Sequence, residues 1–239
     1  MPGLGTIINV VSVIIAGLLG ILLGKFLKPR IQQTLINSNG VCVIFIGILG
    51  VIKESASIVN HHIEVNGIMM LIVSMSLGSL LGEIIDIDKR VEKFGAWLKI
   101  KTGNEKDSEF INAFVTASLT VCIGAMAIVG AINDSLLLDP SVLISKSILD
   151  VITIMVMTAS LGKGCMFAFI PIGIFQGLVT LLARVFKPIM TDTALSNMNL
   201  VGSVLIFCVG LNLIRTKKIR VANMLPALIF AVIWAFLPI

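Results

Sequence analysis

Apolar runs of about 20 residues recur along the whole chain, and they limit what it can fold into. A run of that length lets an α-helix cross a hydrocarbon core that is ~30 Å thick. Charged residues make up only 13% of the 239 residues, whereas a soluble domain carries about 25%. We therefore predict an all-α, polytopic membrane protein in which a single transmembrane domain covers residues 1–239.

We expect about eight transmembrane helices from the spacing of these runs. The expected spans are 4–24, 39–58, 66–85, 109–132, 141–161, 165–186, 195–214 and 221–238. The first apolar segment is too long for a cleaved signal peptide and no basic segment precedes it, so we expect an uncleaved helix. Residues 161–164 are expected to form either a tight turn or a break inside the membrane.

Small residues recur at four-residue intervals on two of the predicted spans. Ala16, Gly20 and Gly24 lie on the first span, and Gly78 and Gly82 lie on the third. This spacing lets the backbone of another helix approach closely. It therefore predicts tight helix packing on these faces, and it makes a homodimer one possible assembly.

Residues 86–107 differ from the rest of the chain, because apolar and basic residues alternate there at helical spacing. The pattern is typical of an amphipathic helix that lies in the membrane interface. A solvated helix in a cytoplasmic loop would give the same pattern. We expect a cytoplasmic amphipathic segment under either alternative.

Lysine and arginine are concentrated in a few loops. Three lie in 25–30, six in 86–107 and four in 215–220, whereas 133–140 has none. Because basic loops stay in the cytoplasm, we expect these three loops inside and both termini outside the bacterial cytoplasmic (inner) membrane. Loop 184–194 is the exception, since its two basic residues fall outside.

An internal repeat explains this exception. Short matches pair 25–29 with 184–188, 40–47 with 202–210, and 65–69 with 221–225. The matches predict a first repeat over 1–85 and a second over 165–239, so that spans 1–3 recur as spans 6–8. An offset of five spans reverses the direction of each helix, which gives the inverted-topology repeat found in many secondary transporters.

The central helix pair, predicted over 108–164, carries most of the polar residues inside apolar sequence. The tetrapeptide Thr-Ala-Ser-Leu occurs there twice, at 116–119 and 158–161. Ionisable side chains in hydrocarbon are costly, so they are expected to face a protein interior or a water-filled cavity. If the fifth span begins near Ser141, Asp150 lies ~13 Å deep at 1.5 Å per residue.

We predict that two helix faces of this pair form a binding site. The candidate residues are Asn112, Thr116 and Thr120 on the fourth span and Lys146, Asp150, Thr153 and Ser160 on the fifth. Lys146 lies one turn from Asp150 and is placed to neutralise it. The alternatives are that Lys146 and Asp150 form a structural ion pair, and that the hydroxyls bond to their own helices.

Three further ionisable residues are weaker candidates for the site. Asp134 is expected at the outer surface, and Lys163 lies in the short connection after the fifth span. Glu54 follows Lys53 at the end of the second span, where an ion pair in the interface is the alternative to a functional role.

The remaining reactive residues give no sign of an enzyme. Four cysteines lie in apolar segments without metal-ligand spacing, and His61 and His62 stand alone, so we expect buried thiols and a histidine pair in a loop. No nucleophile triad, phosphate loop or zinc motif is present in the sequence. We predict no enzymatic activity, no cofactor and no metal. The formal charge of +5 lies in loops, so we also expect no nucleic-acid partner.

Several motifs in the fourth to sixth spans are specific enough to compare with known proteins. They are Cys122-Ile-Gly-Ala-Met-Ala-Ile-Val-Gly followed by Asn133-Asp134, Lys146-Ser-Ile-Leu-Asp150, Ala-Ser-Leu-Gly at 159–162, and Gln176-Gly177-Leu. Over essentially the whole chain, the sequence resembles the uncharacterised bacterial membrane proteins of the YdfK/YqgA type, a domain of unknown function. That family tends to have glycine after both aspartates, where Ser135 and Val151 stand here. The resemblance implies a helical membrane protein and supplies no substrate.

These patterns together favour a small secondary transporter that moves a small polar or ionic solute. Asp150 would be the proton or cation site, Lys146 its partner, and the neutral polar groups would contact the solute. The expected partners are the lipid bilayer and a small-molecule or ion substrate. Two alternatives remain open: a non-transporting membrane scaffold or sensor whose partner surface is 86–107, and a passive ion channel.

The predicted topology places residues 99 and 139 on opposite sides of the membrane. Single cysteines introduced at Lys99 and Asp139 should be labelled by an impermeant thiol reagent from the cytoplasmic side and the outer side, respectively. The measurement is labelling of intact cells against inverted vesicles, and labelling of both cysteines from one side would refute the topology.

Overall fold

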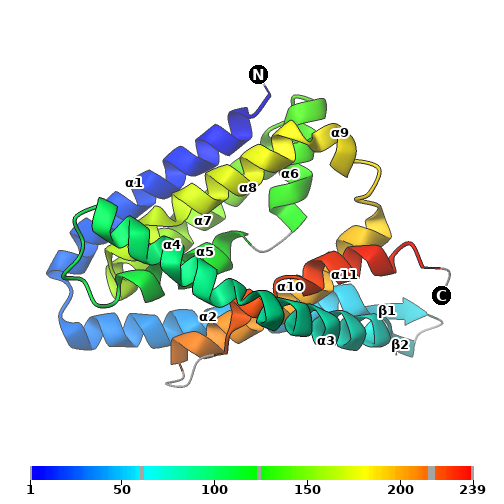
Figure 1. The fold of residues 1–239 in the computed structure, drawn as a ribbon, viewed down its shortest axis with the longest axis horizontal. Helices are drawn as coiled ribbons and strands as arrows, with labels where there is room; N and C mark the ends of the chain where they lie inside the picture. Colours follow the sequence, from blue (N-terminus) through cyan, green and yellow to red (C-terminus); the bar gives the residue numbers. More distant parts are fainter. Residues whose placement is uncertain (1, 60–61, 123–124, 215–218, 238–239) are drawn as a thin grey trace. The chain divides into compact units, whose positions relative to one another are not determined.

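The structure is a computed structural model that describes residues 2–59, 62–122, 125–214 and 219–237 (Figure 1). Its elements are α1 (Leu4–Phe26), α2 (Pro29–Ser55), β1 (Ala56–Val59), β2 (His62–Val65), α3 (Ile68–Ile85), α4 (Ile87–Lys101), α5 (Phe110–Cys122), α6 (Ala125–Leu136), α7 (Ser141–Leu161), the 3-10 helix η1 (Lys163–Ala168), α8 (Phe169–Leu181), α9 (Ala183–Phe186), α10 (Asp192–Ile214), the 3-10 helix η2 (Val221–Met224) and α11 (Ala227–Trp234). The predicted all-α class is confirmed, with a short antiparallel hairpin of β1 and β2 as an addition to it.

Six helices in the described part of the chain are long and apolar enough to cross a membrane. They are α1, α2, α3, α7, α10 and the helix formed by η1 with α8. The predicted fourth span is not one straight helix, because α5 and α6 are bent by 61° at the break between them. The last predicted span corresponds to a shorter apolar helix over 221–234. Part of the basic loop 215–220 lies outside the described residues, as do His61 and Gly124.

The chain forms two compact units, each assembled from two separate stretches of sequence. The first unit comprises residues 1–39 and 89–186, and the second comprises 40–88 and 187–239. Each unit therefore draws helices from both predicted repeats. The first unit contains α1 and α8, and the second contains most of α2 together with α3, α10 and α11.

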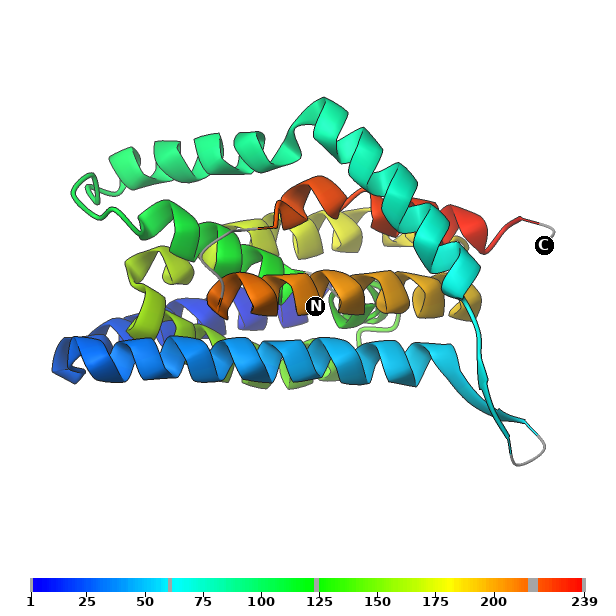
Figure 2. The same ribbon diagram turned by 90° about the horizontal axis from the view of Figure 1, so that it is seen from below.

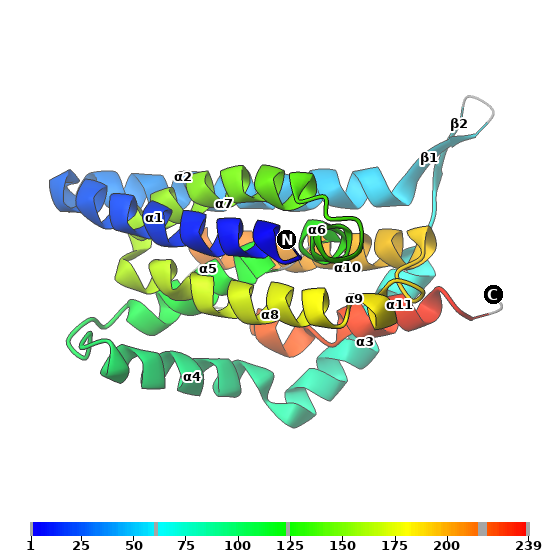
Figure 3. The ribbon, with the colours of Figure 1, turned by 90° about the horizontal axis from the view of Figure 1, so that it is seen from above.

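In the first unit α1 runs beside α7 in the same direction and beside α8 in the opposite direction (Figure 3). A methyl group on Gly20 would lie 2.5 Å from the carbonyl oxygen of Met155, and one on Gly24 would lie 3.1 Å from that of Ala159. The small residues predicted to form a packing face thus let α1 touch the backbone of α7. Because α7 and α8 run in opposite directions, residues 161–164 are a turn, and Gly162 adopts a φ of 107° that suits glycine.

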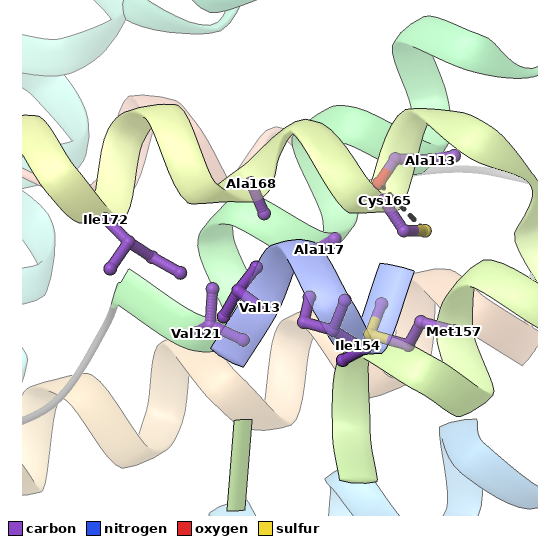
Figure 4. Packing of buried hydrophobic residues seen from close by; sticks show 10 residues of the cluster. Val13, Ala113, Ala117, Val121, Ile154, Met157, Cys165, Ala168 and Ile172 are labelled. Carbon is purple, nitrogen blue, oxygen red and sulfur yellow. Dashed lines mark hydrogen bonds between the residues drawn. The ribbon is translucent and has the colours of Figure 1, made fainter. Parts of the chain in front are cut away.

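A cluster of apolar side chains joins five elements of the first unit (Figure 4). The members labelled there are Val13 of α1, Ala113, Ala117 and Val121 of α5, Ile154 and Met157 of α7, Cys165 and Ala168 of η1, and Ile172 of α8. The Cys165 thiol also donates a hydrogen bond to the carbonyl oxygen of Ala113, at 3.5 Å. This cluster holds the helices that carry the polar residues described below.

The second unit is held by two pairs of antiparallel helices with glycine at the contacts (Figure 2). On α2 and α10, a methyl group on Gly47 would lie 2.7 Å from the backbone nitrogen of Phe207, and one on Gly210 would lie 2.7 Å from that of Ile44. Gly78 and Gly82 of α3 lie against the last two helical elements of the chain, η2 and α11. The packing predicted for this glycine pair is therefore observed.

Helix α4 covers most of the segment predicted to be amphipathic. Its Leu98 is buried and packs in a cluster with Phe110 and Phe114 of α5. The ring of Trp97 is 53% exposed and stacks on that of Phe94, with ring centroids 5.8 Å apart. The helix thus has one packed face and one open apolar face, and the choice between membrane interface and solvent stays a prediction.

The α2–α10 contact should not tolerate a side chain at Gly47. Replacement of Gly47 by alanine should lower the free energy of unfolding by about 1–3 kcal/mol, because its Cβ would overlap the backbone of Phe207. The matched control is Gly177→Ala on α8, where no atom lies within 4 Å of the added carbon. Chemical unfolding of both purified variants in detergent measures the difference, and equal stability of the two would contradict the contact.

Candidate functional site

The structure brings Lys146 and Asp150 together inside the first unit. The ammonium nitrogen of Lys146 lies 2.5 Å from Oδ2 of Asp150, one turn along α7. The two residues are only 7% and 6% exposed. The ion pair that the spacing predicted is therefore present, and it is buried.

Lys146 also reaches the end of a neighbouring helix. Its ammonium group donates a second hydrogen bond, at 2.9 Å, to the carbonyl oxygen of Val121. Val121 lies in the last turn of α5, where carbonyl groups have no partner within their own helix. Lys146 thus satisfies a backbone acceptor beside the break between α5 and α6.

A third residue, Asn9 of α1, completes the site. Asn9 is fully buried, and its side-chain Nδ2 donates to Oδ2 of Asp150 at 3.1 Å. Asn9 was not among the predicted site residues, although a lone amide within the apolar first span is a signal that could have identified it. The site therefore joins α1, α5 and α7 through one carboxylate and one ammonium group.

These contacts explain how the two charges remain inside the protein. Burying a charged group costs several kcal/mol, and attraction between opposite charges offsets this only when further hydrogen bonds satisfy the remaining polar groups. Asp150 accepts from Lys146 and Asn9, and Lys146 donates to Asp150 and Val121. The arrangement can hold a charge-balanced pair and can exchange these bonds for bonds to a polar solute.

Three of the four hydroxyl groups predicted for the site bond to their own helices. Thr120 donates to Thr116, Thr153 to Leu149 and Ser160 to Val156, in each case to the carbonyl oxygen one turn earlier. In apolar surroundings that carbonyl is the nearest acceptor. The alternative stated for these residues, a hydrogen bond to their own helix, is therefore observed for these three.

The predicted polar stripe on the fourth span also lies away from the packed face. The buried side of α5 is formed by Phe110, Ala113, Phe114, Ala117, Ser118 and Val121, whereas Asn112, Thr116 and Thr120 are half-buried beside it. Asn112 donates to Glu109, near the start of α5. The contribution of α5 to the site is the carbonyl of Val121, which a search for polar side chains does not detect.

Asp134 is buried, although we expected it at the outer surface. It is 1% exposed, and its Oδ2 accepts a hydrogen bond from the backbone nitrogen of Gly5 at 2.9 Å. The first backbone N–H groups of a helix have no partner within that helix, so the start of α1 provides a donor for a carboxylate. Its burial was not predicted because this contact joins residues that are far apart in the sequence. The side of the membrane on which Asp134 lies stays a prediction.

The other weak candidates lie elsewhere. Lys163 is exposed at the start of η1, where it borders a depression of about 610 Å³ with residues 103–107. Glu54 lies in the second unit, where Ser196 and Asn199 of α10 donate to it at 2.8 and 3.3 Å and Lys53 lies 3.6 Å away. Glu54 therefore ties α2 to α10 in addition to forming the expected ion pair.

Asp139 provides a contrast with the buried carboxylates. It lies exposed between α6 and α7, and hydrogen bonds from the hydroxyl and the backbone N–H of Ser141 hold the pKa of its carboxyl below the usual range. Asp139 is therefore ionised at neutral pH without a buried partner.

The four thiols are free, and they differ in burial. Cys165 is buried and Cys122 and Cys208 are half-buried, but Cys42 is exposed, so the expectation of buried thiols was wrong at this position. Cys42 lies on the open apolar side of α2, next to the exposed Val41. Among the residues that the structure describes, no group of three or more His, Cys, Asp and Glu side chains is placed to hold a metal ion.

Comparison with known proteins gives a family match over nearly the whole chain. A family model described as "Protein of unknown function (DUF554)" matches residues 4–236. The chain is 31% identical over 232 residues to "Uncharacterized protein YqgA" of Escherichia coli (strain K12), covering 95% of this chain and 94% of that protein. It is 28% identical over 225 residues to "Uncharacterized membrane protein YdfK" of Bacillus subtilis (strain 168), covering 94% and 92%. No solved structure matches. The resemblance inferred from the motifs is confirmed.

The stability of the buried pair should depend on both of its members. Lys146→Met should lower the free energy of unfolding by roughly 3–5 kcal/mol, because it leaves the Asp150 carboxylate buried without a counter-charge. Changing Asp150→Asn in the same chain should restore most of this loss. Thermal and chemical unfolding of the two single variants and the double variant measure the coupling, and additive losses in the double variant would show that the pair contributes no shared stability.

Proposed function

Since the chain belongs to the DUF554 family of proteins of unknown function and is a helical membrane protein, we propose that it is a small secondary transporter and not an enzyme. It would move a small polar or ionic solute across the bacterial cytoplasmic membrane. The buried Lys146–Asp150 pair at the break between α5 and α6 carries this proposal.

The position of the pair is what favours transport. Transporters bind solutes and ions near the middle of the membrane, at helices that are interrupted so that backbone groups become available. Here the carbonyl of Val121, at the end of α5, faces the ammonium group of Lys146. A purely structural helix bundle packs more cheaply without a buried carboxylate, so the retained charges support a role in binding.

An inverted repeat is the second part of the proposal, and the helix directions support it. The equivalent helices would be α1 with α8, α2 with α10, and α3 with α11. In each pair the two helices pack antiparallel, as a two-fold axis in the membrane plane requires. On α2 and α10, the two glycine contacts have the same form: Gly47 packs on the backbone of Phe207, three residues before Gly210, and Gly210 packs on that of Ile44, three residues before Gly47.

The same directions support eight crossings with both termini on one side, and the lysine and arginine counts favour the outer side. Helices α1 and α7 run parallel, as the first and fifth spans must. Helices α1 and α8 run antiparallel, as the first and sixth spans must. Eight crossings require that α5 and α6 together form one broken span. They also require that η2 and α11 together form the last span.

A non-transporting scaffold or sensor is the second candidate, and one observation favours it. The hydroxyls expected to meet a solute are bonded to their own helices, and Asn9, Lys146 and Asp150 are almost fully buried. A permanently closed site would look like this, and so would a transporter in a state closed to both sides.

The transport test begins with a thermal-shift screen of the purified protein against ions, amino acids, polyamines and organic acids. A specific solute stabilises the folded state by mass action, by about 2.7 kcal/mol at one hundred times its dissociation constant. Uptake of that solute into proteoliposomes should be lost in Asp150→Asn and in the stable double variant with Lys146→Met.

The exposed Asp139→Asn variant is the matched control and should transport normally. The double variant is expected to keep most of its stability, so its loss of uptake would not be explained by unfolding. Full uptake in either Asp150 variant would remove the pair from the mechanism, and an absence of any stabilising solute would favour the scaffold.

A further inference from the structure

We propose that Asp134 binds one small alkali-metal cation, Na⁺ or Li⁺, inside the first unit. The site would use Oδ1 of Asp134, with the side-chain oxygen of Asn9 as the next oxygen along α1. That this cation is the coupling ion rests on the proposed transport function. The binding of the cation depends only on Asp134, Asn9 and their surroundings.

The buried charges of this region do not all cancel. Lys146 lies 2.5 Å from Asp150, so these two charges cancel. Asp134 is the remaining buried carboxylate of this region, and no described lysine or arginine lies within salt-bridge distance of it. The ionisable side chains on the helices packed against α6 are Lys146 and Asp150 of α7, the exposed Arg184 of α9 and Lys25 at the far end of α1.

The hydrogen bonds to Asp134 do not balance its charge. Its Oδ2 accepts from Gly5, and the start of a helix contributes a partial positive charge of only about one half. Its Oδ1 is buried and has no hydrogen-bond partner in the described structure. An unpaired charge in the interior is costly, so a buried carboxylate in this condition is suited to hold a cation.

A second buried oxygen lies one turn further along α1. Asn9 must turn its Nδ2 toward Asp150, because a carboxylate accepts hydrogen bonds and does not donate them. This orientation leaves the Oδ1 of Asn9 buried and without a partner in the described structure. Gly5 and Asn9 are four residues apart on one face of α1, a rise of about 6 Å.

The chemistry of these groups selects the ligand. Carboxylate and amide oxygens are the donors that hard cations prefer. One uncompensated negative charge calls for a single positive charge, so a monovalent ion fits better than a divalent one. A cation at Asp134 would neutralise the carboxylate that holds the start of α1, and α1 also carries the amide that holds Asp150. Ion binding and the central pair would thus be coupled through one helix.

The test measures ion binding without any transported solute. Thermal unfolding of the full chain in detergent is followed in NaCl, LiCl, KCl and choline chloride at equal ionic strength, at several pH values between about 5 and 9. Na⁺ or Li⁺ should raise the unfolding temperature saturably above choline. In Asp134→Asn, which keeps an acceptor for Gly5, the shift should disappear, and in the exposed Asp139→Asn control it should persist.

Equilibrium binding of radioactive Na⁺ provides the second measurement. The wild-type chain should bind one ion, and Asn9→Ala should weaken binding about tenfold, which corresponds to 1.4 kcal/mol. Identical melting in all four salts, a shift that survives in Asp134→Asn, or stabilisation by acid alone would overturn the proposal. Because neither the solute nor an Asp150 variant enters these measurements, they can fail while the transport test succeeds, and the reverse.

Discussion

The ion pair between Lys146 and Asp150 is the interaction on which the first unit depends. A lysine ammonium group has three donors, and here two of them are given to Asp150 on the same helix and to Val121 on α5. Asp150 in turn accepts from Asn9 on α1. Non-helical backbone inside a membrane protein is tolerated only where its polar groups are satisfied. Lys146 meets that condition for the carbonyl oxygen of Val121, in the last turn of α5.

Glycine positions decide which helices approach one another. Between membrane helices there is little hydrophobic driving force, and close van der Waals packing takes its place. Gly20 and Gly24 let α1 contact the backbone of α7, and Gly47 and Gly210 do the same for α2 and α10. The first contact brings Asn9 within reach of Asp150. The second fixes an antiparallel pair whose two glycine contacts mirror each other.

The sequence predicted the features that depend on local spacing and missed those that depend on distant contacts. Lys146 and Asp150 are one turn apart on one helix, so their pairing followed from helix geometry alone. Asn9 reaches Asp150 across 141 residues, and Asp134 reaches Gly5 across 129, and neither contact leaves a periodic signal. The hydroxyl residues are a different case, because their role in a site stays a prediction. Their spacing was correct for a shared face, but in apolar surroundings their own helix offers a nearer acceptor than any neighbour.

In the proposed repeat, the buried charged residues lie outside the repeated helices. Asp134, Lys146 and Asp150 all lie between residues 108 and 164, in the segment that has no counterpart in the repeat. Helix α1 offers these carboxylates two neutral groups: the N–H of Gly5 donates to Asp134, and the amide of Asn9 donates to Asp150. A movement of α1 therefore changes the surroundings of both carboxylates together. The helices of the repeat would supply the motion and the central helices the charge, which is the division of roles that coupled transport needs.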